Sequence, residues 1–166
     1  MPMADEDYMK IALEQARTAL AQGEFPVGCI LVFEKRVIAG GRRSGTAGRC
    51  KNETDHAEMR ALRRMAELDG IAGAIDLFTT MEPCLMCYSA AILNGIRRIV
   101  YAYEDVMGGG TGCDLSRLPP LYRKADITVV PRVLRKESLQ LFKAYFSDPA
   151  TDYWRDSLLA RYTLDQ

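Results

Sequence analysis

The stretch Ile75–Cys87 reads IDLFTTMEPCLMC and decides the class of fold. Its first six residues, Ile75 to Thr80, are short, mainly apolar and partly β-branched, which predicts a buried strand. After Glu82-Pro83 the pattern becomes helical and continues to Asn94-Gly95, a pair that is typical of a helix end. A strand that leads directly into a helix predicts an α/β domain in which helices pack on a sheet.

The same alternation extends in both directions along the chain. The order α, β, β, α, β, α, β, β, α with a helical tail predicts a layered α/β domain without internal repeats. We expect Asp5 to cap the first helix and Leu68 to belong to the buried stripe of the second. Polar, glycine-rich residues 40–55 predict a loop. The expected helices span about 5–22, 55–68, 85–93, 134–146 and 152–161, and the expected strands span 27–33, 36–39, 75–80, 98–103 and 127–131.

Composition limits the class of protein. The 166 residues suit one domain, residues 1–166, with residues 147–166 as its helical tail, and 48% hydrophobic residues are enough for a core. Because 22 basic residues balance 22 acidic ones, a broad basic surface for nucleic acid is not expected. The chain shows neither a membrane-length apolar run nor a signal-peptide pattern, so we expect a cytoplasmic protein without a membrane partner.

Two short motifs carry chemistry: His56-Ala57-Glu58 and Pro83-Cys84-Leu85-Met86-Cys87, each at the start of an expected helix. One imidazole and two thiolates, with Cys84 and Cys87 one helical turn apart, form a three-ligand zinc site. Three protein ligands leave a fourth position for water, whose pKa zinc lowers. Glu58 lies close enough to act as the acid and base, so we predict His56, Cys84 and Cys87 as metal ligands and Glu58 as the catalytic residue.

Other interpretations of these residues remain open at this point. Cys84 and Cys87 could form a redox pair, although this leaves Glu58 without a role. A closed structural zinc site could recruit Cys50 or Cys113 as a fourth ligand, which would make the chain a non-catalytic module. Cys29 is interpreted as a small buried apolar residue within a strand.

With these motifs in place, the chain resembles the cytidine deaminase superfamily, in the branch that contains bacterial tRNA adenosine deaminases and guanine deaminases. The resemblance extends to about Phe146 and includes residues 24–32, which read EFPVGCILV. It implies a three-layer fold with a central five-stranded mixed sheet, bound zinc and a homodimer. We expect substrate contacts from Phe25, Ala57, Arg43 and Asp105.

The chain departs from this branch at two places. The family usually has an asparagine after the second strand, where this chain has Arg42-Arg43, and arginine only donates hydrogen bonds whereas asparagine also accepts them. The alternative is that both arginines belong to a solvated loop. The tRNA enzymes also tend to end in a basic helix, whereas residues 147–166 are nearly neutral and contain Tyr153, Trp154 and Tyr162, which either cover a pocket or dock the last helix.

These features predict a zinc-dependent hydrolytic deaminase that releases ammonia from the exocyclic amino group of a nucleobase. The missing basic tail and the balanced charge favour a small-molecule substrate, such as a free base, a nucleoside or a related amino-heterocycle. The alternative is a tRNA-specific adenosine deaminase, in which case tRNA is the partner. A third hypothesis is a non-catalytic module stabilised by zinc.

Overall fold

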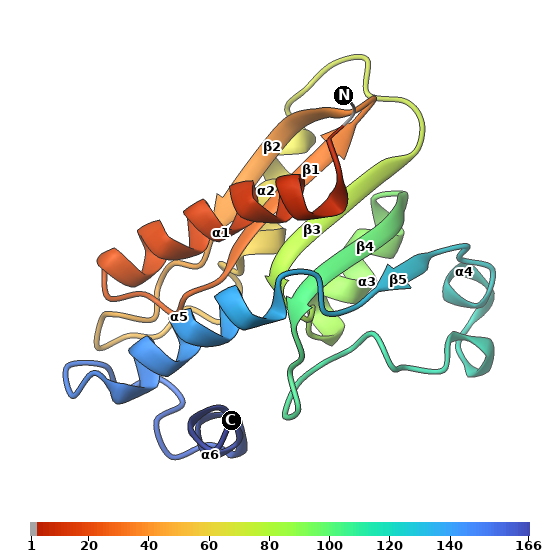
Figure 1. The fold of residues 1–166 in the computed structure, drawn as a ribbon. Helices are drawn as coiled ribbons and strands as arrows, with labels where there is room; N and C mark the ends of the chain where they lie inside the picture. Colours follow the sequence, from red (N-terminus) through yellow and green to blue (C-terminus); the bar gives the residue numbers. More distant parts are fainter. Residues whose placement is uncertain (1–2) are drawn as a thin grey trace.

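A computed structural model describes residues 3–166 as three layers, with a mixed sheet between two sets of helices (Figure 1). Helices α1 and α5 pack on one face of the sheet, and α2 and α3 pack on the other. The predicted α/β class and five-stranded mixed sheet are confirmed. The elements in chain order are α1 (Asp5–Ala21), β1 (Gly28–Phe33), β2 (Arg36–Arg42), α2 (Ala57–Met65), β3 (Ile75–Met81), α3 (Leu85–Leu93), β4 (Ile96–Tyr103), η1 (Leu115–Arg117), α4 (Pro120–Arg123), β5 (Thr128–Val130), α5 (Arg135–Ser147) and α6 (Leu158–Leu164).

The sheet has the strand order β2-β1-β3-β4-β5. Strand β1 pairs antiparallel with both β2 and β3, whereas β3, β4 and β5 run parallel. Strands β3 and β4 therefore end at the same edge of the sheet, at Met81 and Tyr103. This edge is where α/β proteins usually place their ligand sites.

The β1–β2 hairpin turns at Glu34 and Lys35, between the two expected strands. Both have positive φ angles, 48° and 64°, as a two-residue type I′ turn requires. Strand β2 continues to Arg42, three residues beyond the expected end at Ala39, because Gly40, Gly41 and Arg42 pair with β1.

Two glycines allow helices to approach the sheet closely. A Cβ atom at Gly28 would lie 2.2 Å from the carbonyl oxygen of Ala12 in α1. A Cβ atom at Gly41 would lie 2.3 Å from the carbonyl oxygen of Ala57, the first residue of α2. Gly41 therefore sets the position of the helix that follows His56 and carries Glu58.

We expect Gly41→Ala to lower the free energy of unfolding by about 1–3 kcal/mol, because the added methyl group meets rigid helix backbone. Urea denaturation of the zinc-free protein measures the change. Gly112→Ala is the matched control, since its added Cβ atom would meet no atom within 4 Å. Equal stability of the two variants would show that α2 can move away from the sheet at little cost.

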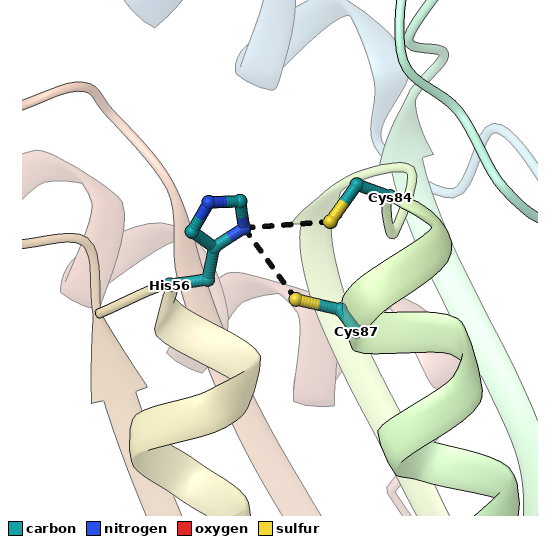
Figure 2. Close-up of side chains that lie close together, drawn as sticks. All are labelled: His56, Cys84 and Cys87. Atoms are coloured by element: carbon teal, nitrogen blue, oxygen red, sulfur yellow. Dashed lines mark hydrogen bonds between the residues drawn. The ribbon is translucent and has the colours of Figure 1, made fainter. Parts of the chain in front are cut away.

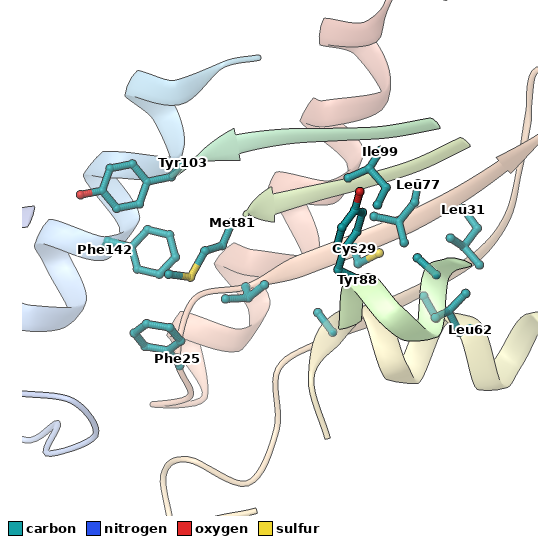
Figure 3. Packing of buried hydrophobic residues seen from close by; sticks show 14 of the residues in the cluster. Phe25, Cys29, Leu31, Leu62, Leu77, Met81, Tyr88, Ile99, Tyr103 and Phe142 are labelled. Atoms are coloured by element: carbon teal, nitrogen blue, oxygen red, sulfur yellow. The ribbon is translucent and has the colours of Figure 1, made fainter. Parts of the chain in front are cut away.

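The core spans both faces of the sheet and ends in an aromatic group beside α5. Phe25 lies edge-on to Phe142, with 5.1 Å between ring centroids, and to Tyr145 at 5.2 Å. Figure 3 shows Phe25 and Phe142 next to Met81 and Tyr103, at the edge where the parallel strands end. Between residues 3 and 166, no helix combines the length and the apolar character needed to cross a bilayer.

The C-terminal segment is fastened to the end of β4 by Glu104. Its carboxylate accepts hydrogen bonds from Arg135 Nη2 at 2.6 Å and from the Tyr162 hydroxyl at 2.7 Å. The Arg135 hydrogen bonds lower the pKa of Glu104 to about 2. Tyr162 therefore docks the last helix, which is one of the two roles that the sequence suggested for the aromatic residues of the tail.

Three further local expectations were wrong. The last helix begins at Leu158, because residues 153–156 form turns. Ala4, not Asp5, is the N-cap of α1, and Asp5 instead pairs with Arg98 of β4. Leu68 lies beyond the end of α2 and is exposed. The short helices η1 and α4 were not expected at all.

Candidate active site

The two motifs meet where α2 and α3 begin. His56 is the N-cap residue of α2, and Glu58 lies in the first turn of this helix. Cys84 is the N-cap residue of α3, and Cys87 lies in its first turn. Figure 2 shows the imidazole of His56 pointing toward both sulfur atoms across the space between the two helices.

The separations between these side chains fit a zinc ion. His56 Nδ1 lies 3.6 Å from Cys84 Sγ and 3.5 Å from Cys87 Sγ, and the three ligand atoms are within 4.8 Å of one another. Tetrahedral zinc with ordinary bonds to sulfur and nitrogen separates its S and N ligands by about 3.5 Å. The described side chains therefore have both the donor types and the spacing of a zinc site.

No fourth protein ligand joins this group within residues 3–166. Neither Cys50, which is exposed, nor Cys113 belongs to the ligand cluster. The geometry favours an open three-ligand site over the closed structural site. Cys29 is fully buried in β1, as expected of a small apolar residue.

The protonation of the metal-free site agrees with metal binding. Hydrogen bonds from Cys87 and His56 lower the pKa of Cys84 to about 4, so that Cys84 is a thiolate. The hydrogen bond with Cys84 and burial raise the pKa of Cys87. Burial lowers the pKa of His56, but the hydrogen bond to Cys84 and the nearby negative charges outweigh it and raise the pKa. The raised pKa values favour protons at Cys87 and at the His56 imidazole, and metal binding would compete with these protons.

Glu58 is buried beside the ligands without belonging to their cluster. Thr79 Oγ1 donates a hydrogen bond to Glu58 Oε1 at 3.1 Å, and Cys87 Sγ donates to Glu58 Oε2 at 3.5 Å. Burial raises the pKa of Glu58, which brings a carboxyl group closer to the value suited to proton transfer near neutral pH.

One pocket opens onto these groups and brings all of the predicted site residues together except the buried Cys87. Asp105, Arg43, Phe25 and Ala57 all line it. The pocket encloses about 480 Å³ including the part open to solvent. The full lining consists of Phe25, Val27, Arg43, His56, Ala57, Glu58, Met81, Glu82, Cys84, Asp105, Met107, Tyr153, Trp154 and Leu159.

The predicted contact residues also have structural roles. Phe25 belongs to the aromatic core, and Ala57 is fully buried at the start of α2. Asp105 Oδ1 accepts hydrogen bonds from the backbone N–H groups of Met107 and Gly108, so this side chain stabilises a turn as well as facing the pocket. The solvated-loop interpretation was wrong for Arg43, whose side chain is only 2% exposed.

Sequence reasoning missed two residues that hold the site in place. Thr79 positions Glu58, and the only signal was a pair of threonines inside an apolar strand. Glu82 accepts hydrogen bonds from the Asp105 backbone N–H and from the Thr111 hydroxyl, which fixes the loop that contains Gly108, Gly109 and Gly110 beside Cys84. A Cβ atom at Gly109 would lie 2.7 Å from the backbone carbonyl oxygen of Asp105, so the loop requires glycine there.

Comparison with known proteins agrees with this geometry. Residues 2–103 match the family model described as the cytidine and deoxycytidylate deaminase zinc-binding region. The tRNA-specific adenosine deaminase of Agrobacterium fabrum is 35% identical over 151 residues, which cover 87% of this chain and 95% of that protein. The tRNA-specific adenosine deaminase of Bacillus subtilis is 31% identical over 147 residues, which cover 87% of this chain and 89% of that protein.

Solved structures are similar over the same region. A structure from a study of A-to-I editing by tRNA:A34 deaminases at the wobble position is 30% identical, with a TM-score of 0.66, and covers 81% of this chain and 97% of that chain. The structure of guanine deaminase from Nitrosomonas europaea is 29% identical, with a TM-score of 0.65, and the match covers 86% of this chain and 84% of that chain.

Proposed function

This chain belongs to the cytidine and deoxycytidylate deaminase family and is a zinc-type deaminase, and we propose that it removes the exocyclic amino group of a purine. The observation that carries this proposal is the buried Glu58 beside the His56, Cys84 and Cys87 cluster, at the base of the pocket. The named relatives support a purine, because their names specify adenosine or guanine.

We propose that His56, Cys84 and Cys87 hold the zinc and that Glu58 moves the protons. Zinc, when bound, would act as a Lewis acid and lower the pKa of a water molecule. Glu58 accepts a proton from the attacking water and delivers it to the ring nitrogen next to the amino-bearing carbon. Glu58 then transfers the second proton of the water to the leaving nitrogen. Ammonia departs, and the ring carbon keeps the oxygen as a carbonyl group.

The wobble adenosine of tRNA is the first candidate substrate. The sequence-based preference for a small molecule is not confirmed, and the comparisons support the tRNA alternative better. The two tRNA-specific relatives described above each match 87% of this chain. On this proposal tRNA is the partner, and the cytoplasm remains the expected compartment.

A free purine base is the second candidate, because the C-terminal segment closes one side of the pocket. Tyr153 is buried beside Arg43, and Trp154 is 45% exposed at the pocket. An indole ring there could stack on a planar heterocycle. The formal net charge of zero also suits a small ligand better than an RNA.

Ammonia release by the zinc-loaded protein separates these candidates. The substrates are an anticodon stem-loop with adenosine at position 34, then adenine, guanine, cytosine and their nucleosides. Turnover of the stem-loop alone supports the tRNA proposal, and turnover of a free purine supports the second candidate. Absence of ammonia from all of them would overturn the proposed function.

We also propose that residues 1–166 form one domain and that two copies associate through the outer face of α3. Leu85, Leu93 and Leu121 are between 58% and 61% exposed, and they lie along or beside an apolar groove between α3 and residues 113–122. Apolar patches of this kind are typical of protein interfaces. A second copy is the proposed occupant, because the family resemblance implies dimers.

We expect Leu121→Lys to weaken the dimer at least about tenfold, because a charge would be desolvated at the interface. Sedimentation equilibrium measures the dissociation constant. Leu68→Lys changes another exposed leucine, beyond the end of α2, and should leave it unchanged. A dimer unaffected by Leu121→Lys would place the interface elsewhere.

A further inference from the structure

Arg43 is the only lysine or arginine that lines the active-site pocket among the described residues. Its side chain is 2% exposed, and its Nη1 atom donates hydrogen bonds to the carbonyl oxygens of Ser44 at 2.5 Å and Asn52 at 2.7 Å. These two bonds anchor one side of the guanidinium to the loop that follows β2. The positive charge is therefore held in a fixed place.

The other side of the guanidinium is less well satisfied. Nη2 donates to Glu53 Oε2 at 3.3 Å and to the Tyr153 hydroxyl at 3.5 Å, both long contacts. Glu53 is 55% exposed, so water screens its charge. Arg43 Nε has no hydrogen-bond partner among residues 3–166, and it is not one of the buried side-chain atoms left without a partner, so this atom is open to solvent.

The surroundings of Arg43 are otherwise acidic. Glu58, Glu82 and Asp105 line the same pocket, and the positive charge of Arg43 is close enough to oppose protonation of His56. A guanidinium carries five N–H donors and no acceptor. A substrate atom that faces Arg43 must therefore accept a hydrogen bond. A substrate N–H group at this place would face a guanidinium N–H group, and neither donor would have an acceptor.

We propose that Arg43 is a specificity-determining residue that holds a hydrogen-bond acceptor of the substrate with its Nε and Nη2 edge. The acceptor is a ring nitrogen or a phosphate oxygen. This proposal rests on the proposed function, since it concerns the substrate of the same pocket.

The donor-only character of Arg43 limits which edge of a purine can face it. In adenosine, N3 and N7 only accept hydrogen bonds, and in guanine N7 and O6 only accept them. Arg43 therefore selects an acceptor edge and disfavours an N–H group at this place, in either base.

Fluorescence of Trp154 gives a direct test of binding. This residue is the only tryptophan in the chain and lines the pocket, so a ligand there changes the emission of one known residue. Zinc-free protein binds without turnover and is titrated with adenosine, 3-deazaadenosine, 7-deazaadenosine and adenosine monophosphate. The three nucleosides are also placed at position 34 of an anticodon stem-loop, and each ligand is measured with wild type and with Arg43→Gln.

We expect Arg43→Gln to weaken adenosine binding about tenfold to a hundredfold, as is typical when a hydrogen bond to a charged group is lost. The analogue that lacks the contacted nitrogen should bind wild type and Arg43→Gln equally. If the acceptor is the phosphate, the monophosphate should instead lose its advantage over adenosine in the variant. Equal losses for every ligand would overturn the proposal and make Arg43 a structural residue.

Glu53→Gln is the matched control. It removes the negative charge beside Arg43 but keeps an amide oxygen that the Tyr153 hydroxyl can reach. It therefore tests the contact between Arg43 and Glu53 without removing the guanidinium. We expect ligand binding within about threefold of wild type, because Arg43 keeps its Nη1 anchors. A loss equal to that of Arg43→Gln would also overturn the proposal.

The proposal and the proposed function can fail separately. Absence of ammonia release overturns the deaminase function, whereas the fluorescence titrations still decide whether Arg43 selects an acceptor. With an active enzyme, Arg43→Gln should raise KM more than it lowers kcat.

Discussion

Glu58→Gln should lower kcat for deamination by about 10²–10⁴-fold while the protein keeps its zinc and its affinity for substrate. The amide has the size of the carboxyl group but cannot take a proton from water or deliver one to the ring. This loss corresponds to a barrier increase of about 3–5 kcal/mol. Single-turnover ammonia release, zinc content and Trp154 fluorescence titration together measure the three quantities.

Stability separates a catalytic loss from a folding defect. Glu58 is 4% exposed, and burial disfavours its charged form. A neutral glutamine at this place should therefore be at least as stable as the native residue, and Thr79 can still donate to the amide oxygen. We expect thermal unfolding of Glu58→Gln at or above the wild-type temperature.

Glu67→Gln is the matched control, since it makes the same chemical change at an exposed residue just beyond α2. It should leave kcat unchanged. If Glu58→Gln kept kcat within about tenfold of wild type, another group would have to move the protons, and the proposed mechanism would be wrong.

The clustering of the three expected metal ligands could be predicted from sequence because their geometry is local. His56 and Glu58 start one helix, and Cys84 and Cys87 occupy one turn of another. Secondary structure alone therefore fixes the relative positions within each pair. Only the meeting of the two pairs depends on tertiary structure, and helices of an α/β domain commonly begin at the same edge of the sheet.

Arg43 could not be placed from sequence, because its burial depends on contacts far along the chain. The pattern around it is polar and predicts a solvated loop. Its partners include Tyr153, which is 110 residues away, and loop carbonyls whose direction no periodicity encodes. The continuation of β2 through Gly41 has a similar cause, because the close approach of α2 determines where that strand can pack.

The conformation of residues 152–161 also could not be predicted from the sequence. Apolar spacing over residues 152–161 suggests a helix, but residues 153–156 form turns that direct Tyr153 toward Arg43 and place Trp154 at the pocket. Trp154 has a φ angle of 58°, which a helix does not allow. Tertiary contacts therefore override local propensity at the segment that borders the site.

Cys84→Ser should lower zinc affinity by more than the roughly 10–100-fold that loss of an outer partner costs, because a hydroxyl replaces a thiolate in direct contact with the metal. Its activity at limiting zinc should fall in proportion to its metal content. Zinc content after dialysis against a chelator measures the first effect, and ammonia release during zinc titration measures the second. A variant that keeps full zinc content would remove Cys84 from the ligand set.

Cys50→Ser and Cys113→Ser are the matched controls, and they distinguish an open site from a closed one. Neither residue lies in the ligand cluster, so both variants should keep their zinc and their activity. Cobalt-substituted protein gives an independent readout, because its spectrum changes when a thiolate ligand is lost. If Cys113→Ser changed that spectrum, the metal would have four protein ligands and no position for water, and the hydrolytic mechanism would fail with it.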